Sequence, residues 1–157
     1  MTRLLFILFF TLPLFTACHN KTSQASGDNG AFAKAKSHSD GVNIDRISQS
    51  GELIIGTISG PDTYFDYQGR GMGLQDALAE DFANTLGVGV RVELATDSTE
   101  LAKMLKKGDV DVIAYQLSPS FCQKQGIATA GAKNAKTGAS WAIQPDAKDL
   151  AEALNDW

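Results

Sequence analysis

Apolar residues fill positions 4–15 almost without interruption, directly after the single basic residue Arg3. A run of this length is typical of the hydrophobic segment of a secretory signal peptide. It is too short for a membrane-spanning helix, which needs ~20 apolar residues. The small residues Thr16 and Ala17 follow, and Cys18 comes next. Residues 1–17 are therefore predicted to be a signal peptide and take no part in the fold.

The next stretch, residues 18–43, has no hydrophobic period and is rich in Ser, Asn, Gly, Lys and Ala. A segment of this composition cannot bury a core, so we predict a flexible tether. The folded domain is predicted to cover residues 44–157. It should begin with a short helical segment that contains Ile44 and Ile47.

Beyond the tether, the apolar pattern predicts strands alternating with helices. The strands are expected at residues 52–58, 88–94, 110–115 and 139–144. The first is continuously apolar, and the second alternates apolar and polar residues. Residues 59–73 are expected to be a loop, and residues 116–138 give no clear pattern.

Three further helices are predicted by apolar spacing and by their end signals. Leu74, Leu78, Phe82 and Leu86 recur every four residues, and Gly87 ends that helix. In the next helix Asp97 is the expected N-cap, Leu101, Met104 and Leu105 form the buried stripe, and Gly108 ends it. Asp146 is the expected cap of a last helix, in which Leu150, Ala153, Leu154 and Trp157 form one face.

Strand–helix–strand–helix–strand order predicts a parallel sheet with right-handed crossovers. The expected fold class is α/β, a three-layer sandwich with a mostly parallel sheet of order 2-1-3 plus a C-terminal strand. In such sheets ligands bind beyond the carboxyl ends of the strands, where the strand order reverses. The loops at 59–73 and 116–123 are therefore expected to lie side by side at the binding edge.

Charge and cysteine content limit the function classes. The chain has 14 Lys and Arg against 18 Asp and Glu, a net charge of −4. Removal of residues 1–17 takes away Arg3 and makes the charge −5, so nucleic-acid binding is not expected. The chain has 2 cysteines. Cys122 is expected to be a small buried apolar residue rather than a reactive thiol, and no metal site or cofactor is predicted.

Phe15-Thr16-Ala17-Cys18 resembles a bacterial lipobox. The resemblance implies that Cys18 is acylated, for example with palmitate, and anchors a lipoprotein on the periplasmic side of a bacterial membrane. The alternative is an ordinary secretory signal with an incidental cysteine. His19 in the place of Asp favours the outer membrane, by resemblance to enterobacterial sorting.

An ordered set of segments resembles the first lobe of the amino-acid type of periplasmic solute-binding protein. These segments are residues 45–47, 51–57, 73–79, 82–88 and 108–114. The segments also resemble the solute-binding-like module of membrane-bound lytic transglycosylase F. Residues 140–157 resemble the segment by which that family returns to its first lobe. The family's second lobe takes on the order of a hundred residues, which the connection here cannot supply, so a single lobe is expected.

The resemblance also implies ligand-binding residues. Tyr64 and Phe65 match the aromatic wall after the first strand, and Ser118 and Ser120 match polar residues after the third. The family's arginine, which clamps a carboxylate, falls at or near Gln123, so the bidentate guanidinium fork is absent. The alternative for the aromatic residues is that their rings simply cover the sheet edge of a small core.

No catalytic residue is predicted. The only histidines, His19 and His38, lie in the tether, so a nucleophile has no nearby histidine base. The transglycosylases that the chain resembles carry their catalytic glutamate in a separate lysozyme-like domain, which would begin after Trp157. The chain is therefore expected to be a non-enzymatic binding module for a small solute or a cell-wall peptide, associated with transport or the cell wall. The alternative is an interaction or regulatory lipoprotein, or a decayed remnant, that docks a partner protein on the open cleft face.

Overall fold

The computed structural model describes residues 42–157 of the chain. The predicted signal peptide 1–17, the expected lipidation residue Cys18 and most of the predicted tether lie outside the described residues. Within the part that is described, no helix is long and apolar enough to cross a membrane.

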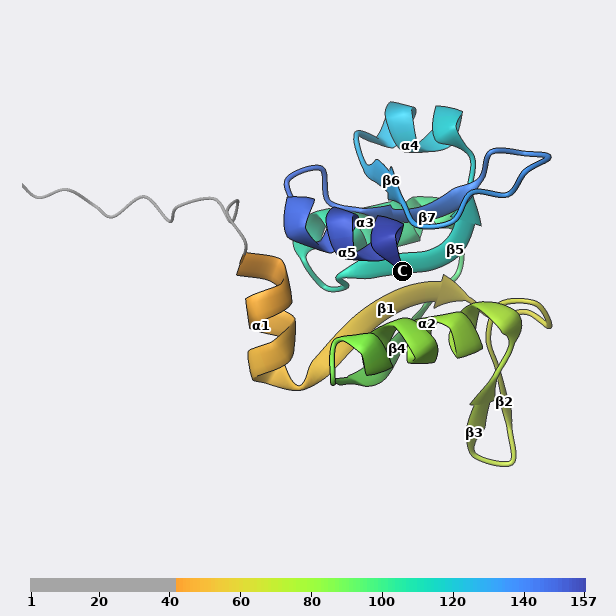
Figure 1. Cartoon of the computed structure of the whole chain (residues 1–157). Coiled ribbons are helices and arrows are strands. Elements are labelled where there is room, and N and C mark those ends of the chain that lie inside the picture. Colours follow the sequence, from red (N-terminus) through yellow and green to blue (C-terminus); the bar gives the residue numbers. More distant parts are fainter. Residues whose placement is uncertain (1–41) are drawn as a thin grey trace, which may run out of the picture. The chain divides into compact units, whose positions relative to one another are not determined.

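A five-stranded sheet of order β4-β1-β5-β7-β6 forms the centre of the lobe (Figure 1). β1 (Glu52–Ile58) pairs in parallel with β4 (Gly89–Ala95) on one side and with β5 (Val112–Leu117) on the other. β7 (Ser140–Ile143) is antiparallel to β5. The predicted order 2-1-3 with an added C-terminal strand is confirmed, as is the mostly parallel character of the sheet.

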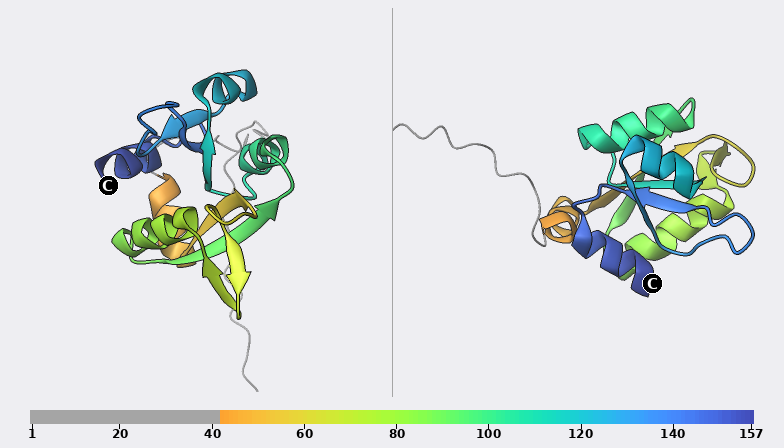
Figure 2. Two further views of the ribbon diagram at one scale, coloured as in Figure 1. Left: turned by 90° about the vertical axis from the view of Figure 1, so that its right-hand side faces the viewer. Right: turned by 90° about the horizontal axis from the view of Figure 1, so that it is seen from above.

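Helices cover both faces of the sheet, which confirms the predicted three-layer sandwich (Figure 2). α1 (Val42–Ser50), α2 (Leu74–Thr85) and α5 (Lys148–Asp156) pack on one face. α3 (Ser98–Lys107) and α4 (Pro119–Gln125) pack on the other. The first core includes Ile47, Leu53, Ile55, Phe82, Trp141, Leu150 and Leu154, and the second includes Leu101, Leu105, Val110, Ile113, Leu117 and Cys122. Cys122 is buried as predicted, and burial raises the pKa of its thiol.

The stretch without a clear pattern contains two short elements. Ser118 caps α4, with Pro119 at its first position, and Gly126 ends the helix in the left-handed conformation. β6 (Ala128–Ala130) then pairs antiparallel with β7 at the edge of the sheet. The connection from β6 to β7 folds back on itself, because Asn134 bonds to the backbone of Lys136, Thr137, Gly138 and Ala139. No second lobe is formed within residues 42–157.

The segment predicted to be a loop contains a β-hairpin. β2 (Phe65–Tyr67) pairs antiparallel with β3 (Arg70–Met72). Gln68 and Gly69 connect them with φ values of 54° and 78°, as a two-residue hairpin turn of type I′ requires. The prediction of a loop without strands over residues 59–73 was therefore wrong.

Two details of the predicted helices were also wrong. Leu74 is 61% exposed although it was placed in the buried stripe of α2. An i, i+4 repeat drifts by about 40° per step around a helix of 3.6 residues per turn, so Leu74 has moved away from the face that Phe82 buries. Asp146 does not cap α5, because Ala147 is the N-cap residue and no side chain bonds to that helix end.

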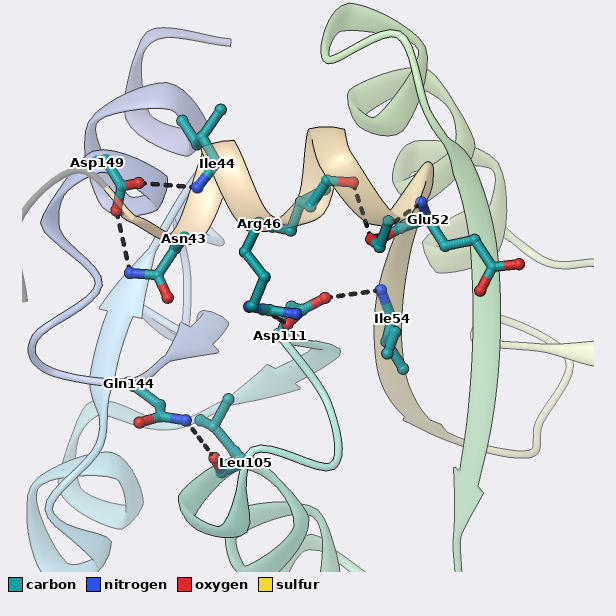
Figure 3. Close-up of polar contacts among 11 residues, drawn as sticks. Asn43, Ile44, Arg46, Glu52, Ile54, Leu105, Asp111, Gln144 and Asp149 are labelled. Carbon is teal, nitrogen blue, oxygen red and sulfur yellow. Dashed lines mark hydrogen bonds and ion pairs between the residues drawn. The ribbon is translucent and has the colours of Figure 1, made fainter. Parts of the chain in front are cut away.

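α1 is attached to α5 by Asp149 (Figure 3). The carboxylate accepts hydrogen bonds from the backbone N–H of Ile44, at 2.8 Å, and from the side-chain amide of Asn43, at 3.1 Å. Burial raises the pKa of the Asp149 carboxyl, but these hydrogen bonds outweigh burial and hold the pKa below its ordinary value. The beginning of the lobe is thereby fixed to its last helix.

Candidate functional site

The carboxyl ends of β1 and β5 meet at one edge of the sheet (Figure 1). The chain leaves β1 after Ile58 into a tight turn, and it leaves β5 after Leu117 directly into α4. Because the two strands are parallel neighbours, the turn and the beginning of α4 lie beside each other. The two segments that follow these strands thus lie at the edge that the sequence analysis selected, and ligand binding there stays a prediction.

Thr63 holds the turn after β1 in a fixed shape. Its hydroxyl donates to the carbonyls of Ile58 and Gly60, and its own carbonyl accepts the backbone N–H of Asp76 at 3.1 Å. The carbonyl of Asp62 accepts the N–H of Gln75 at 3.3 Å. The turn thus satisfies two N–H groups at the beginning of α2, and it carries Tyr64 and Phe65 on a rigid base.

Tyr64 and Phe65 are both half-buried where the turn joins the hairpin. Phe65 is the first residue of β2 and pairs with Met72 of β3. Tyr64 lines a pocket with Gly71 and Asp76, on the side of the edge that faces α2 and β4. Tyr64 therefore does more than cover the core, since it also forms a wall of a pocket.

The polar residues after β5 take different positions on α4. The hydroxyl of Ser118 accepts the N–H of Phe121 at 3.3 Å, and it lies 3.2 Å from the hydroxyl of Ser120. Both serines are exposed at the binding edge. Gln123 is exposed in the second half of α4, farther along the helix from that edge. Ligand contact by these residues stays a prediction.

Asp76 is a residue of this edge that the sequence analysis did not select. It belongs to the first turn of α2 and is only 5% exposed. Burial, and then the negative charge of Glu80, raise the pKa of its carboxyl. A signal was present in the sequence, because Asp76, Ala79 and Ala83 are spaced i, i+3, i+7 and therefore share the buried face.

A second pocket, of about 400 Å³, lies at the opposite edge of the sheet (Figure 3). Several of its polar side chains are bonded to other parts of the lobe. The carboxylate of Asp111, which is buried, accepts from the guanidinium of Arg46 and from the N–H of Ile54, the latter at 3.0 Å. Gln144 donates to the carbonyl of Leu105 at 2.8 Å. These contacts join α1, β1, α3 and β7, so we assign this network a structural role.

Comparison with known proteins gives relatives of one kind. No protein-family model matches the chain. Membrane-bound lytic murein transglycosylase F of Vibrio vulnificus (strain YJ016) is 40% identical over 75 residues, which are 48% of this chain and 14% of that protein. The protein of the same name from Vibrio campbellii is 30% identical over 112 residues, 71% of this chain and 18% of the relative. The chain thus spans less than a fifth of the length of these two curated relatives.

Solved structures match the lobe more completely. The arginine-bound form of domain 1 from TmArgBP superposes with a TM-score of 0.63 at 25% identity, over 71% of this chain and 94% of that chain. A truncated arginine-bound ArgBP from T. maritima gives a TM-score of 0.50 at 27% identity, over 55% of this chain and 41% of that chain. The isolated domain is therefore matched almost whole, and the longer protein only in part.

The described part of this chain is a single α/β lobe of the periplasmic-binding-protein type, homologous to the solute-binding-like N-terminal region of the membrane-bound lytic murein transglycosylase F proteins.

Proposed function

We propose that this protein is a lipid-anchored, solute-binding-like module on the periplasmic side of a bacterial membrane. It binds a small amino-acid-type solute or a cell-wall peptide at the carboxyl edge of its sheet, in association with transport or the cell wall, and without catalysis. The observation that carries the proposal is the match to an isolated arginine-bound domain, 94% of which this chain covers.

That match bears on whether a solute can bind without a second lobe. Domain 1 from TmArgBP is described as arginine-bound while being an isolated domain. A lobe of this fold therefore has a precedent for holding a solute without a partner lobe. We infer that the open edge of the present lobe, with Tyr64, Phe65, Ser118 and Ser120 along it, is sufficient for binding.

The chemistry of the described residues favours binding over catalysis. Residues 42–157 contain no histidine, and the one cysteine among them, Cys122, is buried with a raised pKa. A buried thiol of this kind is a poor nucleophile. The hydroxyls of Ser118 and Ser120 bond to each other and to the helix backbone rather than to a base.

A second candidate function is the docking of a partner protein without a small solute. It is favoured by three exposed apolar side chains, Tyr67, Met72 and Leu74, on the hairpin and at the beginning of α2. Such a surface suits protein contact. The solute screen described next distinguishes the two functions.

We expect at least one amino acid or muropeptide to raise the melting temperature of the purified full-length chain, since a solute that binds only the folded state stabilises it.

Ser120→Ala should lower the affinity for that solute roughly three- to ten-fold, because one hydroxyl is lost from the edge. Ser118→Ala is avoided, since loss of an N-cap costs about 1 kcal/mol by itself. Ser48→Ala, at an exposed position of α1, is the matched control. A screen in which no solute stabilises the chain would contradict solute binding and support docking.

Lipid anchoring through Cys18, with the outer membrane favoured, is tested by labelling. Cells that express the chain are grown with radioactive palmitate, and the chain is then isolated from separated membranes. Label should be incorporated by the original chain and by Cys122→Ser, but not by Cys18→Ser. These are the 2 cysteines of the sequence, so the pair is a matched comparison. Label that persists after Cys18→Ser would refute the anchor.

A further inference from the structure

A pocket of about 330 Å³ lies between the hairpin, α2 and β4. Its wall includes Tyr64, Gly71, Asp76, Glu80 and residues 90–92. Tyr64 connects it to the turn that follows β1, whereas residues 90–92 pair with residues 53–55, in the first half of β1. The pocket thus begins beside the predicted binding edge and runs along the outer strand of the sheet.

Asp76 is the unusual residue of this pocket. It is only 5% exposed, and no hydrogen bond from residues 42–157 to its carboxylate is found. No fully buried side-chain oxygen or nitrogen of the described residues lacks a partner, so the carboxylate oxygens of Asp76 reach solvent at the pocket. Buried carboxylates in proteins are normally paired or hydrogen-bonded, because desolvation of an unpaired charge is costly. Asp76 lines the pocket, so the pocket is where a partner can reach it.

The charge around Asp76 is negative. Glu80 follows four residues later on the same side of α2 and also lines the pocket. Val90 and Val92 pack against the core beneath α2, so strand alternation turns the side chain of Arg91 toward the other face. There its guanidinium lies 3.7 Å from Glu52 and 3.3 Å from Glu93. Arg91 also lines the pocket, but its ion pairs are with Glu52 and Glu93, and no ion pair to Asp76 or Glu80 is formed within residues 42–157.

Gly71 lets the backbone of the hairpin approach the carboxylate closely. A Cβ atom at this position would lie 2.7 Å from Oδ2 of Asp76 and 2.9 Å from Cε2 of Tyr64. The carboxylate and the aromatic ring therefore both pack against the glycine and lie beside each other in the wall of the pocket. A carboxylate beside an aromatic ring suits an organic ammonium group, whereas a divalent metal ion takes a larger set of oxygen ligands.

We propose that the Asp76 pocket is the subsite for a primary ammonium group of the bound solute. Asp76 and Glu80 supply the negative charge, and Tyr64 supplies the aromatic wall. The inference rests on the proposed solute-binding function and names the chemical class of its ligand. The amine can belong to a free basic amino acid or to a cell-wall peptide that carries a free side-chain amine.

The test is calorimetric titration of the purified full-length chain with four probes. L-Lysine and a muramyl peptide with a free lysine side chain represent the two sources of the amine. The Nε-acetylated form of each probe has the same backbone and no side-chain charge. We expect the free amines to bind, and acetylation to weaken binding at least about ten-fold, as for loss of a charged hydrogen bond. The tighter of the two amines identifies the source.

Three variants connect that result to the pocket. Asp76→Asn keeps the shape of the side chain and should weaken binding of the free amines by about the same factor as acetylation does. Gly71→Ala keeps both carboxylates and should weaken binding of the amines, because its Cβ, 2.7 Å from Oδ2 of Asp76, would displace the carboxylate or the Tyr64 ring. Asp109→Asn removes a charge from an exposed position after α3 and should change nothing. Cooperative thermal unfolding of each variant confirms that it is folded.

The outcomes separate the two proposals. Equal binding of the free and acetylated probes, or full affinity in Asp76→Asn, would overturn the ammonium subsite and leave solute binding intact. Failure of all probes, together with failure of every solute in the thermal screen, would overturn both. Binding of acidic or neutral solutes alone would also refute the ammonium subsite.

Discussion

We expect replacement of Phe82 by alanine to lower the free energy of unfolding by about 3–5 kcal/mol, the usual cost of truncating a buried phenylalanine. Phe82 is 0% exposed at the centre of α2. Its ring centre lies 5.5 Å from that of Trp157 at a tilted angle, a geometry that adds to simple burial. The truncation therefore leaves a cavity between α2 and α5 and removes an aromatic contact. Urea unfolding followed by circular dichroism measures the effect.

Leu74→Ala is the control for that variant. Leu74 begins the same helix but is 61% exposed, so its truncation should cost less than about 0.5 kcal/mol, as surface substitutions usually do. Equal losses for the two variants would mean that α2 does not bury the face that the structure assigns to it.

The second large effect is expected from Gly73→Ala. Gly73 precedes α2 with φ 136° and ψ 156°, a region that only glycine adopts readily and that costs another residue about 1–3 kcal/mol. A Cβ atom there would also lie 2.3 Å from the carbonyl oxygen of Thr63. The Cβ atom is attached directly to the backbone of residue 73, and the oxygen belongs to the backbone of Thr63. The contact can therefore be relieved only by moving the turn away from α2. We expect a total loss of about 3 kcal/mol or more, together with weaker solute binding.

Gly69→Ala separates backbone strain from the steric clash. Gly69 has φ 78° in the hairpin turn, but nothing lies within 4 Å of a Cβ atom built there. It should lose only about 1 kcal/mol, from the left-handed conformation alone. The same denaturation assay on both variants gives the comparison. A loss for Gly73→Ala no greater than that for Gly69→Ala would show that the turn does not press on α2 as described.

The sheet and its longer helices were predictable because their signals are local and strong. The continuous apolar run of β1, the Asp97 cap of α3 and the helix-ending Gly87 and Gly108 each have one physical interpretation, and each is confirmed. The crossover rule then sets the strand order. The hairpin was missed because strands of three residues are too short to show an alternation. α4 and β6 were missed for a similar reason, since each is brief and built from small or polar residues.

The candidate site was predictable only in part. Topology alone places Tyr64 and Ser118 at the same edge, because parallel neighbouring strands end together. The importance of Asp76 comes instead from the hairpin, which brings Gly71 over a carboxylate that the sequence leaves on an ordinary first turn. The i, i+3, i+7 spacing with Ala79 and Ala83 marks Asp76 as part of the buried face. That spacing does not indicate which neighbouring element covers the carboxylate.

The connection between β6 and β7 has an evolutionary consequence. These strands are adjacent and antiparallel. The hydrogen bonds of Asn134 close most of the connection, and one further bond joins the N–H of Gly131 to Asn155 of α5. An insertion or deletion there leaves the order and pairing of the strands unchanged. A lineage can therefore gain or shed a whole domain at this one point, and the remaining lobe keeps its core.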